Sequence, residues 1–154
     1  MNLVTRLSTA LGTLLLMTGC ATVQMADQQA QDDIKQFRTQ PGLTNLFVCR
    51  EQAFLVGAGI TTDVQLDGES IGFVKPNTFV QAWVEPGEHT IQMKNDGIAG
   101  MHSPKITFET QGSDTRFLWI GVTGGGMGTY TIDHFDTPQA GMRCVQDAKY
   151  SVAR

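Results

Sequence analysis

The three histidines, His89, His102 and His134, are the side chains with the clearest capacity for acid–base or metal chemistry. None lies in an H-x-x-x-H or H-E-x-x-H arrangement and no pair of cysteines lies close to one, so their spacing predicts no metal site. Asp133 and His134 are adjacent in a segment that alternates like a strand, so their side chains should point to opposite faces and form no direct dyad. No G-x-S-x-G sequence is present, and no Ser, His and acid set can be given triad roles. We therefore expect no enzymatic activity and no cofactor, unless a cleft gathers Asp133 or His134 with other titratable groups.

A glycine-rich stretch, residues 121–128, has the sequence GVTGGGMG. It lacks the G-K-[ST] ending of a phosphate-binding P-loop, and no helical pattern follows it. The stretch therefore indicates a hairpin loop. Because glycines contribute no packing of their own, this loop is also a candidate contact surface, formed by Thr123, Gly124, Gly125, Gly126 and Met127.

The N-terminus has the features of an export signal. Arg6 precedes an apolar stretch, residues 7–17, that is too short to span a bilayer comfortably. The sequence Met17, Thr18, Gly19, Cys20 follows and resembles the lipobox of bacterial lipoproteins, with Met17 in place of the usual Leu. The resemblance implies cleavage after residue 19 and acylation of Cys20, including palmitate, and Ala21 after the cysteine implies retention at the outer membrane. The alternative is an ordinary secretory signal in which Cys20 has no role.

Two cysteines, Cys49 and Cys144, remain if Cys20 is acylated. In an oxidising periplasm two such thiols usually pair, and this bond would close a loop of about 95 residues and clamp the start of the domain to its end. The alternatives are two buried free thiols or separate partners.

Composition excludes some classes of partner. The chain has 154 residues, 41% of them hydrophobic, and a formal net charge of −4. Its basic residues are scattered, so nucleic acid is not expected as a partner. The length indicates one domain.

The chain divides into three parts: a signal peptide at residues 1–19, a tether at 20–41, and a β-domain at 42–154. The tether is polar and rich in glutamine, with a thin apolar stripe at helical spacing formed by Ala26, Ala30, Ile34 and Phe37. It is therefore either a short helix or disordered. Pro41 and Gly42 end it.

Short alternating segments predict eight to ten strands and hence an all-β fold, an antiparallel sandwich or small barrel. Residues 43–50 and 115–122 are apolar on both faces, which is typical of central strands. Residues 142–150 would close the domain, with Cys144 in the last strand or in a loop beside it. Trp83 and Trp119 are expected in the core.

Residues 64–93 read as strand, turn, strand, turn, strand, turn, strand. Asp67 and Gly68 supply a hairpin turn, and Pro86 and Gly87 supply another reversal. The stretch resembles a PEGA-type unit, with V-x-x-D-G-x-x-x-G followed by P-G-x-H-T. With the lipobox, it is similar to small exported lipoproteins of unknown function. The resemblance implies an all-β envelope module and brings no catalytic residues with it. His89, at the start of the last of these strands, is expected to hydrogen-bond the turn before it.

These observations favour a non-enzymatic outer-membrane lipoprotein that faces the periplasm, held to the membrane by its lipid and acting as an envelope structural module or as an interaction module for a protein or glycan. The alternative is a small-ligand-binding lipoprotein that uses the end of the sandwich near the glycine-rich loop as its mouth.

Overall fold

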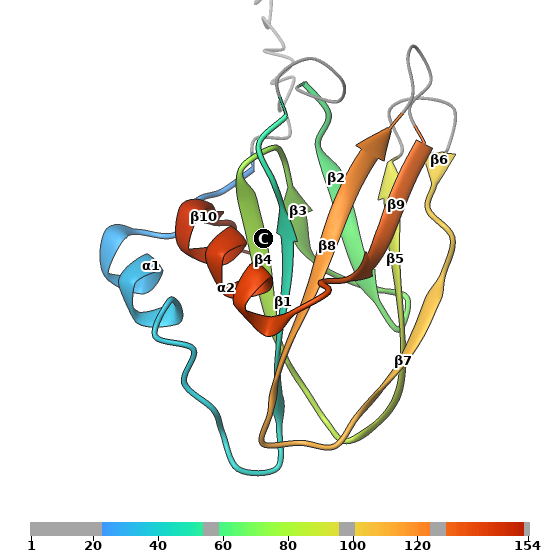
Figure 1. The fold of residues 1–154 in the computed structure, drawn as a ribbon. Helices are drawn as coiled ribbons and strands as arrows, with labels where there is room; N and C mark the ends of the chain where they lie inside the picture. Colours follow the sequence, from blue (N-terminus) through green and yellow to red (C-terminus); the bar gives the residue numbers. More distant parts are fainter. Residues whose placement is uncertain (1–22, 54–58, 96–100, 124–128, 153–154) are drawn as a thin grey trace, which may run out of the picture.

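Two packed β-sheets form the body of the protein, and two short helices lie against the outside of one sheet (Figure 1). The computed structural model describes residues 23–53, 59–95, 101–123 and 129–152. Ten strands and two helices lie in these ranges. The predicted all-β sandwich with eight to ten strands is therefore confirmed. Neither described helix has the length and apolar content to cross a membrane.

The first sheet has the strand order β10-β4-β1-β8-β9. Its strands are β1 (Thr44–Arg50), β4 (Thr78–Val84), β8 (Thr115–Thr123), β9 (Thr129–His134) and β10 (Lys149–Tyr150). β1 pairs antiparallel with β4 and parallel with β8, so the sheet is mixed. Every residue of β1 is buried, as expected of a strand that is apolar on both faces.

The second sheet has the order β3-β2-β5-β6, with β7 also paired to β5. Its strands are β2 (Thr62–Leu66), β3 (Glu69–Val74), β5 (Gly87–Asn95), β6 (Met101–His102) and β7 (Ile106–Thr110). β2 and β3 form the hairpin predicted from Asp67 and Gly68, whose φ angles are 52° and 87°. Two consecutive positive φ angles are what a two-residue hairpin turn requires.

The remaining strands of residues 64–93 do not continue as neighbouring hairpins. After Pro76 and Asn77 the chain crosses to the first sheet as β4, and after Pro86 it returns to the second sheet as β5. The predicted turns are present, but β4 pairs with β1 and β10 while β5 pairs with β2. Proline and glycine turns fix where a chain reverses and not which strand it meets next.

Side chains pack in two separate layers. The layer between the sheets contains Leu46, Val48, Val64, Val74, Val80, Val84, Ile91, Met93, Phe108, Leu118, Ile120, Tyr130 and Ile132. The second layer lies on the outer face of the first sheet and contains Phe47, Cys49, Phe79, Phe117, Cys144, Val145 and Ala148. Successive residues of β1 and β8 enter opposite layers, which explains why both strands are apolar on both faces.

The prediction of a last strand over residues 142–150 is wrong for most of its length. Residues Pro138–Asp147 form the helix α2, and only Lys149–Tyr150 forms a strand. The Thr137 hydroxyl accepts a hydrogen bond from the Ala140 N–H, and Pro138 stands at the start of the helix, a favoured N-terminal pair. The buried face of α2 consists of Gly141, Cys144, Val145 and the following Ala148.

The segment before the domain is helical at residues Gln28–Ile34, named α1. Ile34 and Phe37 from its predicted apolar stripe pack against the outer layer. The Phe37 ring lies 5.3 Å from that of Phe47 and 5.7 Å from that of Phe117, both edge to face. Phe37 itself has φ 51°, a strained angle for an aromatic residue, so this packing must outweigh the local backbone cost.

Candidate functional site

The outer face of the first sheet, where α2 crosses it, carries hollows that could bind another molecule. Gly141 permits the close approach of the helix, because a Cβ there would lie 2.3 Å from the Phe117 Cβ of β8. Thr137 and Gly141 therefore fix where α2 begins and how deeply it sits. The helix leaves hollows on either side.

The predicted pairing of Cys49 with Cys144 is supported. Their sulfur atoms are 1.96 Å apart and their Cα atoms 6.3 Å apart, across a sequence separation of 95 residues. The bond joins β1 to α2 instead of joining two strands, because Cys144 lies on the sheet-facing side of the helix. Both cysteines are buried, so the bond lies within the outer layer.

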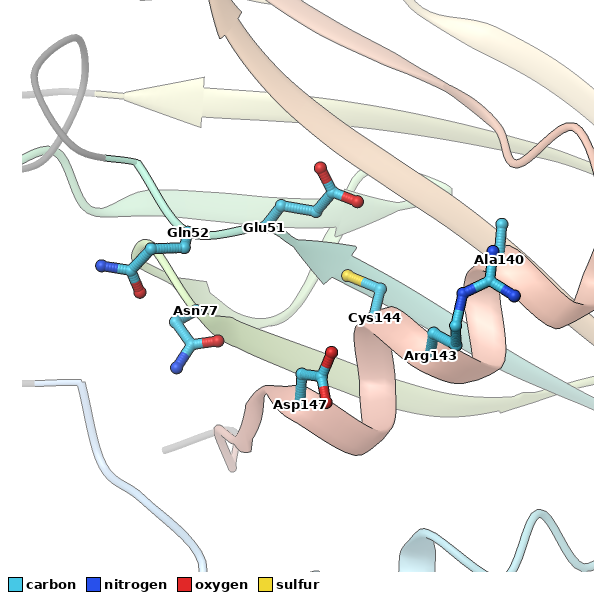
Figure 2. Close-up of a pocket in the computed structure, with 7 residues that line it drawn as sticks. All are labelled: Glu51, Gln52, Asn77, Ala140, Arg143, Cys144 and Asp147. Carbon is cyan, nitrogen blue, oxygen red and sulfur yellow. The ribbon is translucent and has the colours of Figure 1, made fainter.

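A hollow of about 370 Å³ lies above this bond, between α2 and the end of β1 (Figure 2). Glu51 and Gln52 line it from the segment after β1, and Arg143 and Asp147 line it from α2. Asn77 completes the wall in a left-handed conformation with φ 60°, its N–H donating to the Glu51 carbonyl. Among the described residues, Arg143 makes no ion pair. The hollow thus offers one guanidinium, two carboxylates and two amides to solvent.

A neighbouring hollow of about 390 Å³ shares Glu51 and Ala140 with the first. Trp119, Asp133, His134, Phe135 and Asp136 form the rest of its lining. It therefore gathers three carboxylates around one indole, with no lysine or arginine in its lining. The Trp119 ring lies over Gly121, where a Cβ would approach the ring to 2.3 Å. This is the kind of cleft that an enzymatic interpretation would require.

The groups of this second hollow are not arranged as a catalytic pair. The Asp133 carboxylate accepts a hydrogen bond from the backbone N–H of His134, at 2.7 Å, and not from its ring. The His134 ring instead lies edge to face with Phe108 of the second sheet, 6.3 Å between centroids. No serine, threonine or free cysteine lines the hollow. Its three carboxylates and one indole are complementary to a positively charged group.

A third hollow, about 450 Å³, separates α1 from β4 and is lined in part by Trp83, Tyr150 and Asn45. Asn45 is buried, with its amide donating to the Arg38 carbonyl and its oxygen accepting from Gln81. Burial raises the pKa of Tyr150. The expectation that Trp83 and Trp119 belong to the core is wrong, because both are only half-buried on the outer face.

His89 has the structural role predicted for it and a further one. Its Nε2 lies 2.8 Å from the carbonyl oxygen of Glu85, beside the turn before β5, and its Nδ1 lies 2.7 Å from Oδ2 of Asp67 in the β2–β3 turn. Both ring nitrogens face acceptors, so the geometry favours the doubly protonated ring. Partial burial opposes this, but the hydrogen bonds that the ring donates to the Asp67 carboxylate and to the Glu85 carbonyl, together with the nearby negative charge, outweigh it and raise the pKa of His89.

The same contact acts on Asp67. Its desolvation would raise the pKa, but hydrogen bonds from the His89 ring and from the Thr90 N–H, the latter at 2.7 Å, more than compensate and lower it. The Asp67–His89 contact therefore links the β2–β3 turn to the turn before β5.

Other predicted site residues lie outside the described residues. These are Cys20 and residues 124–127 of the proposed contact loop, while Thr123 ends β8. His102 has its backbone in the short strand β6. Among the described residues, no three His, Cys, Asp or Glu side chains are grouped so as to hold a metal ion.

The sequence did not predict the two hollows beside α2, because the residues that line them come from four separate segments of the chain. Thr137 followed by Pro138 was the available signal, since it marks a helix start and so a helix over the sheet. Glu51, Asp133 and Asp136 carry no spacing that would group them in advance.

Residues 40–127 match the family described as "Protein of unknown function (DUF2846)", which is more than half of the chain. A protein of Haemophilus influenzae (strain ATCC 51907 / DSM 11121 / KW20 / Rd), described as "Uncharacterized protein", is 31% identical over 87 residues. The aligned part is 56% of this chain and 51% of that protein, so the chain spans about half the length of the relative. No solved structure matches. The family match contains β1 to β8 and ends before β9 and α2.

Proposed function

We propose that this chain, which belongs to the DUF2846 family of proteins of unknown function, is a non-enzymatic lipoprotein of the outer membrane that faces the periplasm. It would be anchored by acylated Cys20 and would act as a structural or interaction module of the envelope, with another envelope protein or a glycan as its partner.

The observation that carries the proposal is the Cys49–Cys144 pair, at bonding distance. Structural disulfides persist in oxidising compartments and are rare in the cytosol. This one ties the outer helix to the central strand of the first sheet, so it is part of the architecture. An exported location is also what residues 7–20 of the sequence predict.

The position of Met25 supports a short anchor. Met25 forms a bridge with Ser151, and the Ala26 N–H donates to the Tyr150 carbonyl, so the packed body begins five residues after Cys20. At about 3.5 Å per extended residue, the Cα atoms of Cys20 and Met25 can be at most roughly 17 Å apart. A body held this close to a bilayer is suited to work at the membrane surface.

The hollows support binding more than catalysis, because the outer face of the first sheet offers carboxylates, amides and half-buried aromatic rings without a positioned nucleophile. The small-ligand alternative has less support. The space between the described strands is filled largely by apolar side chains, which leaves little room there for a ligand, and residues 124–127 of the expected mouth lie outside the described residues.

The direct test is mass spectrometry of the mature N-terminus together with fractionation of the envelope. Wild type should yield an acylated Cys20 peptide in the outer-membrane fraction, and Cys20→Ala should lose both. Gln29→Ala is a control, because it changes an exposed side chain of the segment that follows the anchor and should leave both acylation and fractionation intact. Unmodified Cys20, or unchanged fractionation of Cys20→Ala, would refute the anchor.

A further inference from the structure

The third hollow, between α1 and β4, has walls that hydrogen bonds hold in place. α1 lies beside β10 on the outer side of the first sheet (Figure 1), and Lys35 at its end donates to the Gln146 carbonyl at 2.8 Å. The buried Asn45 amide donates to the Arg38 carbonyl at 2.8 Å and accepts from Gln81 at 2.8 Å, which fixes the segment after α1. The hollow is therefore formed before a ligand arrives, and its volume of about 450 Å³ lies in the range of roughly 300–1,000 Å³ that is typical of small-molecule sites.

Two aromatic side chains line this hollow with groups that the fold does not use. Trp83 is half-buried, and within the described part of the chain its indole makes neither a hydrogen bond nor a ring contact. The Tyr150 ring stacks on Phe79, 5.2 Å between centroids, while its hydroxyl donates to none of the described residues. Tryptophan and tyrosine combine a large apolar ring with a polar group that usually finds a partner. The Trp83 ring, its N–H and the Tyr150 hydroxyl are therefore available to a ligand.

The rim of the hollow is polar and electrically balanced. Its charged members are Asp33 and Arg38, so one carboxylate offsets one guanidinium. Thr39 and Gln40 are exposed, and their side chains make no hydrogen bond to the other residues that the structure describes. The rim thus offers both donors and acceptors. Unlike the acidic hollow around Trp119, it gives no advantage to a cation or to an anion.

An aromatic wall inside a rim of mixed donors and acceptors matches the two surfaces of a sugar ring. A pyranose has an apolar face of C–H groups, which packs on the electron-rich face of an aromatic ring. Its hydroxyls lie at the edge, and each can donate and accept. An acyl chain would instead leave the polar rim without partners, and a strongly charged peptide would find no complementary net charge. The lining therefore favours a neutral saccharide.

We propose that the hollow between α1 and β4 binds a neutral pyranose ring of an envelope glycan, with the ring stacked on Trp83 and its hydroxyls hydrogen-bonded to the polar rim. Because Arg38, Thr39 and Gln40 are exposed, the hollow opens to solvent and the bound ring can belong to a longer chain. This identifies the partner as a glycan, and it rests on the interaction role proposed above but not on the acyl anchor.

The test uses the full chain in micelles of dodecylphosphocholine, a detergent without a sugar headgroup. The probes are two trisaccharides, N-acetylated chitotriose and cellotriose, which separate glycans of acetylated amino sugars from glycans of plain hexoses. Binding is measured by titration calorimetry and by NMR shifts of the two indole N–H resonances, those of Trp83 and Trp119. We expect at least one trisaccharide to bind with a dissociation constant of about 1 mM or lower and to shift the Trp83 resonance alone.

Three substitutions test the site. Trp83→Ala should weaken binding about tenfold or more, because it removes the stacking ring, whereas Trp83→Phe keeps a ring and should weaken it about threefold or less. Trp119→Ala is the matched control, because it removes the other half-buried indole from the same face of the same sheet and should leave the affinity unchanged. Urea unfolding checks that each variant is folded. If Trp83→Ala is not, the resonance of Trp83 in wild type is the deciding measurement.

Several outcomes would overturn the proposal. They are absence of binding by both trisaccharides, unchanged affinity in Trp83→Ala, equal weakening by Trp83→Ala and Trp119→Ala, and a shift of the Trp119 resonance alone. A shift of the Trp83 resonance by envelope proteins freed of glycan, with no shift by either trisaccharide, would assign the hollow to a protein and would also overturn it. None of these results bears on acylation of Cys20, so the two proposals fail separately.

Discussion

Removing the bond between Cys49 and Cys144 should destabilise the protein by a large and calculable amount. The bond closes a loop of 95 residues. In the chain-entropy model, releasing a loop of this length costs about 4.7 kcal/mol at 25 °C. Replacing two buried sulfurs by alanine adds about 1 kcal/mol or more for the space they leave, so the double variant should lose about 5–6 kcal/mol.

This loss is comparable with the whole stability of many small domains, which is about 5–15 kcal/mol. The structure adds a local reason for the effect. α2 is held to β1 by this bond and by few large side chains of its own, because its buried residues are Gly141, Cys144 and Val145. Without the bond, the helix would lose its strongest attachment and expose Phe47 and Phe117 beneath it.

The assay is urea unfolding followed by tryptophan fluorescence, for wild type and Cys49→Ala/Cys144→Ala, each with and without a reducing agent. At a slope of about 2 kcal/mol per molar urea, the midpoint should fall by roughly 2–3 M. Reduction should shift wild type to near the variant and should leave the variant unchanged. A difference below about 1 kcal/mol between oxidised and reduced wild type would refute the reasoning.

Three further changes test the packing and the charges. Gly141→Ala should cost about 3 kcal/mol from overpacking, because its Cβ meets Phe117, and hence about 2 kcal/mol net after the gain of about 1 kcal/mol in helix propensity. Ala140→Gly, which only loses helix propensity, should cost about 1 kcal/mol, and a loss for Gly141→Ala no larger than this in urea unfolding would contradict the reasoning. Thr137→Ala should lower the free energy of unfolding by about 1 kcal/mol, and Thr137→Ser should lower it much less, because serine keeps the hydroxyl that caps α2. Thermal unfolding can measure both, and equal losses would argue against a capping role for Thr137. His89 should stabilise wild type relative to His89→Gln below pH 6.5, and this advantage should disappear as the pH rises through the raised folded-state pKa of His89. Thermal unfolding of both proteins between pH 5 and 9 measures the difference, and the opposite trend would exclude a stabilising contact between His89 and Asp67.

The strands were predictable where burial gives a simple period. Residues of β2 and of the second half of β5 alternate between buried and partly exposed positions, and the sequence shows that alternation directly. β1 and β8 are apolar on both faces because one face meets the core and the other meets the helix layer. The sequence thus predicted that both strands would be covered on both sides, but it did not predict that a helix would form the outer cover.

The helix was not predicted because its apolar face is weak. Gly141, Cys144, Val145 and Ala148 have helical spacing, but they are small residues and give only a weak apolar stripe. Two features favour a helix in this segment. Thr137 and Pro138 favour a helix start, and the Cys49–Cys144 disulfide requires Cys144 to lie over β1. The tryptophans were misplaced for a related reason. Trp83 and Trp119 lie on the outer face, where the helices cover the sheet only in part.

The D-G and P-G-x-H-T stretches look like two independent turn signals in the sequence, yet their polar residues are partners in the structure. Asp67 accepts hydrogen bonds from the Thr90 N–H and from the ring of His89, and the Asp67 N–H donates to the Thr90 carbonyl. β4 lies between these stretches in the chain but belongs to the other sheet, so β5 pairs with β2 only after the chain has passed through the first sheet. A charged contact between the β2–β3 turn and the start of β5 would favour that register over a slipped one, because a shift of one residue would separate Asp67 from His89 and turn Ile91 and Met93 out of the core. His89 therefore has a sufficient structural role in the second sheet, whereas the hollows beside α2 lie on the first sheet.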